Sequence, residues 1–170
     1  MYLINDVQAF IEQGGSVIWP IFFTCLLLWT FIIERFWFYR LSFPRIAAKV
    51  IRDWQARKDH QSWCAYKIRE ATISEINLQL NSKLTAIQTL IVICPMLGLL
   101  GTVTGMVGVF EVISINGTSD AQSMAQGVYR ATIPTMAGLV VALSGYYFSA
   151  RLKQIANNEA NKLTDRLMLL

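Results

Sequence analysis

Three long stretches of the chain are apolar and contain no charged side chain. They cover residues 17–33, 84–110 and 131–150. A helix crosses the hydrocarbon core of a bilayer with about 17 to 25 predominantly apolar residues. The first and third stretches match that length, and the second exceeds it. The pattern therefore predicts an all-α integral membrane protein with three transmembrane helices.

The segments around these stretches complete the predicted division of the chain. We expect an amphipathic helix at 1–16, which lies on the membrane surface or packs against a neighbouring subunit. Residues 34–83 read as two amphipathic helices with a start signal at Ser42–Pro44 and a break near Lys58. The further segments are the first span at 17–33, the second span at 84–113, a polar loop at 114–128, the third span at 129–150 and a C-terminal helix at 151–170.

Basic residues predict how the chain is oriented. Ten of its fifteen Lys and Arg residues lie between Arg35 and Lys83, four follow Ala150, and the first sixteen residues have none. Cytoplasmic loops of membrane proteins are enriched in Lys and Arg. We therefore expect a periplasmic N-terminus and a cytoplasmic C-terminus, with the second and third helices extending into the cytoplasm as a helical stalk. The net charge of +4 then reflects orientation, and we expect no nucleic-acid partner.

Cysteine and histidine residues give no sign of a chemical site. The three cysteines, Cys25, Cys64 and Cys94, and the single histidine, His60, have neither disulfide-framework nor metal-ligand spacing. The sequence also contains no nucleophile–base constellation and no glycine-rich phosphate loop. We expect a protein that is not an enzyme and that holds no metal and no cofactor.

Small residues form a stripe along each of the last two spans. At about 100° per residue, each stripe falls within an arc of about 120° or less. The second span contributes Gly98, Gly101, Thr102, Gly105 and Gly108, and the third contributes Ala131, Thr132, Thr135, Gly138, Ala142, Gly145 and Ser149. Small residues let membrane helices approach closely, so the six glycines are candidate packing residues. The stripes either pack helices within one subunit or line a channel shared by an oligomer.

Hydroxyl groups and one proline make the second interpretation concrete. Thr102, Thr135 and Thr132 are candidate pore-lining residues, because a threonine hydroxyl can bond its own helix or face a partner or a water chain. Pro134 removes the helix hydrogen bond to the Arg130 carbonyl. Such a carbonyl at membrane depth must find another donor, which favours a wet or protein-filled interior over lipid.

The three charge-free stretches contain no Asp, Glu, Lys, Arg or His side chain. Intramembrane proton relays use ionisable side chains, so a proton path here requires an acid from another chain. Glu111 and Arg130 stand only at the outer ends of the second and third spans, where antiparallel helices could pair them. An exposed pair would contribute about 0–1 kcal/mol.

Two motifs resemble the ExbB/TolQ/MotA family, most closely its ExbB branch. They are GLLGTVTG at Gly98–Gly105 and ATIPTMAG at Ala131–Gly138, together with the order and orientation of the spans. The resemblance implies a homo-oligomer, a pentamer, whose second and third spans line a central pore in the inner membrane of a Gram-negative bacterium. In this family the pore holds the single-span helices of ExbD, whose aspartate carries the proton, and TonB passes the work to outer-membrane receptors. Thr102 and Thr135 match the pore threonines of the family.

Two departures from the family pattern limit what can be carried over. Arg130 stands five residues before Thr135, where relatives often have glutamate, and the segment at 34–83 is short for the family. The leading interpretation is a subunit of a motor driven by the proton-motive force that, with ExbD, energises TonB-dependent transport. A TolQ-like motor subunit for envelope integrity, a structural scaffold without ion translocation and a self-sufficient ion channel stay open.

Overall fold

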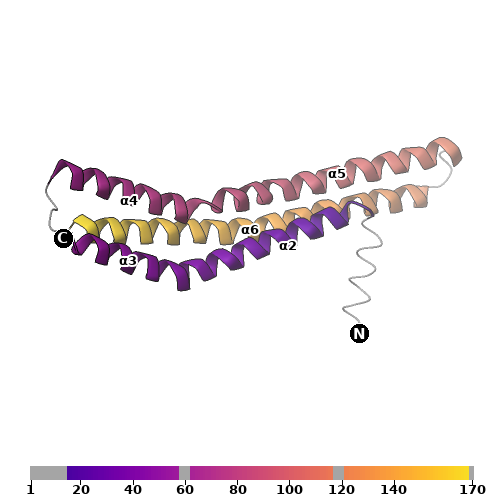
Figure 1. Cartoon of the computed structure of the whole chain (residues 1–170). Helices are drawn as coiled ribbons and strands as arrows, with labels where there is room; N and C mark the ends of the chain where they lie inside the picture. Colours follow the sequence, from indigo (N-terminus) through magenta and orange to yellow (C-terminus); the bar gives the residue numbers. More distant parts are fainter. Residues whose placement is uncertain (1–14, 58–61, 117–120, 169–170) are drawn as a thin grey trace, which may run out of the picture. The chain divides into compact units, whose positions relative to one another are not determined.

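The computed structural model describes residues 15–57, 62–116 and 121–168, and within these ranges every element is a helix (Figure 1). The elements are α2 at Ile18–Trp37, the π-helix η1 at Phe38–Ser42, α3 at Phe43–Gln55, α4 at Trp63–Asn81, α5 at Leu84–Asn116 and α6 at Ala121–Met168. The predicted all-α class is confirmed for these residues. The predicted surface helix at 1–16 lies outside the described part, apart from its last two residues.

Three helical segments are long and apolar enough to cross a membrane in the described part of the chain. They run over Ile18–Gln55, Trp63–Ser114 and Met124–Leu167. Together they cover the three charge-free stretches apart from Val17, so the predicted number of helices able to span a membrane is confirmed. Gly15 precedes the first of them with a φ of +67°, a conformation that glycine adopts without steric strain. The chain turns there before α2 begins.

The helices extend further into the predicted polar loop at 114–128 than we expected. Helix α5 continues to Asn116, and α6 already begins at Ala121. Residues 121–128 read AQSMAQGV, and Ala, Gln and Met are good helix formers, so polarity alone misplaced the boundary. Helix α6 also continues without a break to Met168, which joins the predicted third span and the predicted C-terminal helix.

Pro44 marks a change in helix type, without interrupting the helical chain. Helix α3 begins at Phe43 as the Ser42–Pro44 signal predicts, but no side chain caps it and the preceding residues are helical too. Proline lacks an N–H and its ring collides with the carbonyl four residues earlier. The five residues of η1 widen the helix here, and the Phe43 N–H donates to the Phe38 carbonyl, five residues back. A π-turn of this kind accommodates the proline.

The chain forms two compact units. The described part of the first unit comprises residues up to Trp29 and Thr89–Tyr146, which belong to α2, α5 and α6. The described part of the second unit belongs to Thr30–Gln88 and to the residues from Tyr147 to Met168. Buried residues of the first unit include Ile21, Leu28, Ile91, Cys94, Ile133 and Ala142. Those of the second include Tyr39, Phe43, Trp54, Ile76, Leu80, Leu152, Ala156, Leu163 and Leu167.

Candidate functional site

Glycines bring the backbones of α5 and α6 into direct contact in the first unit. A Cβ atom at Gly98 would lie 2.9 Å from the Thr135 Cα, and one at Gly138 would lie 2.5 Å from the carbonyl oxygen of Cys94. The neighbours are backbone atoms, so a side chain at either position would push the helices apart. This close approach is what small residues allow between membrane helices.

Pro134 and Ala131 continue the same contact along α6. A Cβ atom at Gly101 would lie 2.4 Å from the Pro134 Cβ, and one at Gly105 would lie 2.5 Å from the Ala131 Cβ. Pro134 is among the most completely buried side chains of the described residues. Its ring therefore occupies the volume that Gly101 leaves free. This packing role comes in addition to the predicted loss of the helix hydrogen bond to the Arg130 carbonyl.

Thr135 joins the two helices with a hydrogen bond. Its Oγ1 donates to the carbonyl oxygen of Gly98 at 2.8 Å, and the residue is half-buried. Both partners belong to the predicted small-residue stripes. In this chain the Thr135 hydroxyl thus bonds across the α5–α6 contact, which is neither a bond within its own helix nor a contact with a partner or a water chain.

The other two candidate threonines bond within their own helices. Thr102 Oγ1 donates to the Leu99 carbonyl at 2.8 Å, and Thr132 Oγ1 donates to the Tyr129 carbonyl at 2.7 Å. Thr102 is half-buried and Thr132 is exposed. A hydroxyl that donates in this way keeps lone pairs that can accept a further hydrogen bond. Both oxygens can therefore accept from a partner or from water.

Five of the six predicted packing glycines lie at contacts within the chain. Besides the four described above, Gly145 brings in α2, because a Cβ atom there would lie 2.7 Å from the Leu28 Cδ2 and 3.0 Å from the Ile91 Cγ1. Gly108 differs: a Cβ atom there would meet nothing within 4 Å, and the residue is exposed. Gly108 is thus not a packing residue within this chain.

Gly127 is a packing residue that the sequence reasoning missed. A Cβ atom there would lie 2.4 Å from the Val109 Cγ2. Gly127 falls in the predicted loop at 114–128, outside any predicted helix. Its spacing was the available signal, because it precedes Ala131 by four residues and so continues the stripe by one helical turn.

Glu111 and Arg130 do not form the predicted charge pair. Both are exposed, and the ion pairs between described residues join Lys67 with Glu70, Lys83 with Glu34, and Lys162 with Glu159. The register explains the difference. Since Gly105 faces Ala131 and Val109 faces Gly127, Glu111 and Arg130 are offset by about five residues, or ~7 Å along the helices.

Metal-binding geometry is likewise not found in the described residues, in which no three His, Cys, Asp or Glu side chains gather. The site is therefore a tightly packed contact between α5 and α6 that has hydroxyl groups and no acid among the contacting residues described above. Its chemistry is hydrogen bonding by uncharged groups.

Comparison with known proteins adds the family. Residues 41–165 match the MotA/TolQ/ExbB proton channel family. The chain belongs to this family. The matched range includes all the contacts between α5 and α6 described above. The protein is accordingly a multi-pass membrane protein of a transport family.

Individual relatives carry ExbB names. The chain is 30% identical to "Putative biopolymer transport protein ExbB-like 1" of Synechocystis sp. over 77% of its own length and 64% of that protein. It is 29% identical to "Putative biopolymer transport protein ExbB-like 3" of the same organism over 80% of each chain. It is 35% identical to "Biopolymer transport protein ExbB" of Helicobacter pylori over 42% of its own length and 49% of that protein. The chain thus spans less than two thirds of the first of these relatives. No solved structure matches it significantly.

Proposed function

We propose that this protein is an inner-membrane subunit of a motor driven by the proton-motive force. In this proposal it acts with an ExbD-like single-span protein and energises TonB-dependent transport across the outer membrane. The ExbB names of its relatives favour this role over a TolQ-like role in envelope integrity. No enzymatic activity is part of the proposal.

The observation that carries the proposal is that the charge-free stretches of this channel-family helix pair contain no carboxylic acid. The stretches 84–110 and 131–150 contain hydroxyl groups but no ionisable side chain other than one thiol and two tyrosines. Proton relays in membranes depend on carboxylates or histidines. The carboxylate must then come from a partner, which a single-span helix beside α5 and α6 would supply.

Exposed apolar side chains support assembly into an oligomer. Seven large apolar residues of α5 and α6 in the first unit are 47% to 71% exposed. They are Val103, Val107, Phe110, Met136, Leu139, Val140 and Leu143. Apolar surface of this extent is covered by lipid or by other protein. We propose that copies of the chain, five in the family pattern, close around the partner helix with lipid outside.

Within this assembly the threonines take different roles. Thr102 and Thr132 line the pore with their hydroxyl oxygens, whereas Thr135 borders the pore while fixing α6 to α5 through the bond to Gly98. The basic residues orient the chain with its N-terminus in the periplasm and its C-terminus in the cytoplasm. Helices α3 and α4 then belong to the cytoplasmic stalk.

The test compares two threonines of one helix that face different directions. Thr102→Val removes a proposed pore hydroxyl, and Thr104→Val removes a hydroxyl about 200° away around α5 that bonds only its own helix. We expect Thr102→Val to lower energy-dependent uptake at least fivefold in a strain lacking the natural protein, and Thr104→Val to leave it unchanged. The partner should co-purify equally with both variants.

Two results would contradict the proposal. Full uptake in the assembled Thr102→Val variant would favour a structural scaffold that moves no ions. Rapid proton flux through liposomes that contain this chain alone would indicate a self-sufficient ion channel, because the proposal requires a partner carboxylate for flux.

A further inference from the structure

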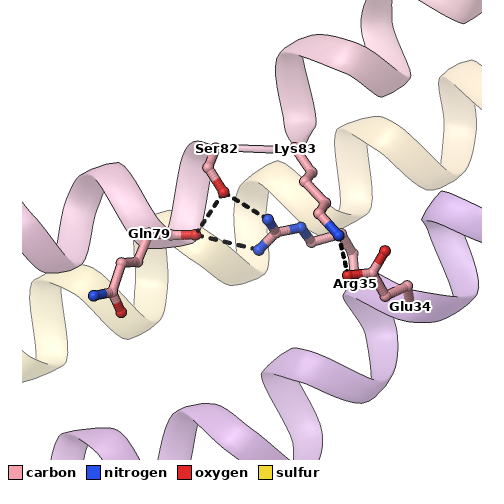
Figure 2. A network of polar contacts seen from close by, with 5 residues as sticks. All are labelled: Glu34, Arg35, Gln79, Ser82 and Lys83. Atoms are coloured by element: carbon pink, nitrogen blue, oxygen red, sulfur yellow. Dashed lines mark hydrogen bonds and ion pairs between the residues drawn. The ribbon is translucent and has the colours of Figure 1, made fainter.

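A buried arginine lies at the end of the first charge-free stretch. Arg35 on α2 is 4% exposed. Its Nη1 donates to the carbonyl oxygen of Gln79 at 3.2 Å, and its Nη2 donates to Ser82 Oγ at 2.7 Å (Figure 2). The guanidinium carbon also lies 5.1 Å from the centre of the Phe38 ring. No carboxylate of the described residues forms an ion pair with Arg35.

The end of α4 supplies the negative partner that a carboxylate would otherwise provide. Helix α4 ends at Asn81, and α5 begins at Leu84 after the turn residues Ser82 and Lys83. The last carbonyl groups of a helix lack partners in the helix and carry the negative end of its dipole. The guanidinium of Arg35 meets this end at Gln79, and Ser82 Oγ donates to the same carbonyl at 3.3 Å.

A second side chain binds the same helix end. The hydroxyl of Tyr39 in η1 donates to the Leu80 carbonyl at 2.8 Å in a buried position. Successive carbonyls, those of Gln79 and Leu80, are therefore bound by side chains that are four residues apart on the α2–η1 segment. The break between α4 and α5 is thus bound by the segment that follows the first span.

An ion pair adds an outer contact between the same elements. Lys83 Nζ contacts Glu34 Oε1 (Figure 2). Both side chains are about half exposed, so solvent screens this pair and it contributes little alone. Adjacent residues of α2, Glu34 and Arg35, nevertheless contact adjacent residues of the turn, Lys83 and Ser82. We call these four residues with Gln79 the α2–turn joint.

We propose that Arg35 is a positioning residue that fixes the α4–α5 turn to α2 through the α2–turn joint. The planar fork of the guanidinium reaches two acceptors at once, which a lysine ammonium on a flexible stem does not reproduce. The joint makes three parts of the second unit move together. They are α2 from Thr30 onward, α4 and the start of α5. The role of the joint in transport rests on the proposed function, because force generated around α5 would reach α4 when these parts move together.

A distance measurement tests the joint independently of transport. Spin labels are placed at two exposed positions, Leu41→Cys and Leu78→Cys, after the three native cysteines have been replaced. Labelled chains are diluted with unlabelled chains so that only distances within one chain are recorded. We expect a single narrow distance distribution for the parent protein.

Substitutions at Arg35 and at an exposed arginine then separate the joint from general charge effects. We expect Arg35→Gln to widen the distribution at least twofold, Arg35→Lys to widen it less, and the control Arg40→Gln to leave it unchanged, since Arg40 is exposed. An unchanged distribution in folded Arg35→Gln would overturn the proposal. If that variant does not accumulate, Ser82→Ala removes one acceptor at an exposed residue, and an unchanged width there would overturn it equally.

Uptake measurements test the role of the joint in transport. Arg35→Gln should lower energy-dependent uptake at least fivefold with the partner still bound, and Arg35→Lys should restore part of it. A widened distribution with full uptake would overturn the role of the joint in transport, although Arg35 would still position the turn. If the parent protein itself supports no energised uptake, the proposed function fails, and the distance distributions still decide whether Arg35 holds the turn.

Discussion

Glycine residues in α5 and α6 occupy two different environments, although all of those predicted to pack belong to the small-residue stripes of the two spans. At Gly138 a side chain would strike the Cys94 carbonyl, whereas at Gly108 it would enter open space. Backbone atoms cannot move aside as the end of a flexible side chain can. The two positions therefore form a matched pair for measuring what the close approach contributes to stability.

Replacing each glycine by alanine should have opposite effects on stability. We expect Gly138→Ala to lower the free energy of unfolding by about 1 to 3 kcal/mol, as overpacked sites do. Gly108→Ala should be neutral or stabilising by up to ~1 kcal/mol, because alanine favours helix over glycine. Unfolding of the purified protein in mixed detergent micelles measures both. Equal losses would contradict the packing described here.

Thr135 should contribute modestly to stability through its bond to Gly98. We expect Thr135→Val to lower the free energy of unfolding by about 0.6 kcal/mol, and by no more than ~2, as for other hydrogen bonds between membrane helices. Thr135→Ser retains the hydroxyl and should recover most of the loss. The same unfolding assay applies, and a Val variant as stable as the parent would show that the bond contributes nothing.

Residue types and their periodicity were enough to predict most of the packing glycines. They did not separate Thr135 from Thr102, because both fall on the small-residue arcs of their helices. The difference depends on the axial register of α5 against α6, which sets Gly98 opposite Thr135. The register also separates Glu111 from Arg130. A single sequence contains no direct measure of it.

At the scale of elements, the structure differs from the prediction near Pro44 and in the polar segment 114–128. The three spanning helices follow from uncharged stretches and were predicted correctly. The π-helix before Pro44 was not predicted, because its cause is a collision between the proline ring and a carbonyl one turn earlier. The α2–turn joint was missed for another reason: Arg35 looked like a basic residue at a span end, and only the fold brings the end of α4 to it.

The contact between η1 and the end of α4 can be tested at Tyr39. Tyr39→Phe removes only the hydroxyl that donates to the Leu80 carbonyl. The buried carbonyl then lacks this hydrogen-bond partner. We expect a loss of about 1 to 2 kcal/mol in the free energy of unfolding. Tyr66→Phe serves as the control, since the Tyr66 side chain is 53% exposed.

Hydrogen exchange locates the effect of Tyr39→Phe. Amide protons in the last turn of α4 should exchange faster in this variant than in Tyr66→Phe. Equal exchange and equal stability of the two variants would contradict a stabilising bond between η1 and α4.

At the scale of the whole molecule, the basic residues are concentrated in two segments of the sequence. Fourteen of the fifteen Lys and Arg residues lie at 35–83 or after Ala150. This asymmetry predicts orientation without any structural input, because it depends on the membrane and not on packing. How many copies assemble depends on surfaces between chains, which the hydrophobic pattern of one chain does not specify.

Cysteine labelling tests the orientation. Cys64 is exposed on α4, whereas Cys94 is buried. A membrane-impermeant maleimide should label Cys64 in inverted vesicles and not in intact spheroplasts. A Ser16→Cys variant that lacks Cys64 should show the reverse pattern, since Ser16 is exposed before α2. Labelling of Cys64 from outside the cell would reverse the proposed orientation.

The packing of Pro134 against Gly101 limits how these two positions can change in evolution. The atom nearest to a new side chain at position 101 is the Pro134 Cβ, at 2.4 Å. Every residue except glycine carries that atom, so replacing the proline by alanine would not make room. A side chain at position 101 therefore needs either glycine at position 134 or a shift of the two helices away from each other. The two positions should show strong epistasis in a pairwise mutational scan of stability. Most double variants should be no more stable than the single variants at Gly101, and those with glycine at position 134 should be the exception.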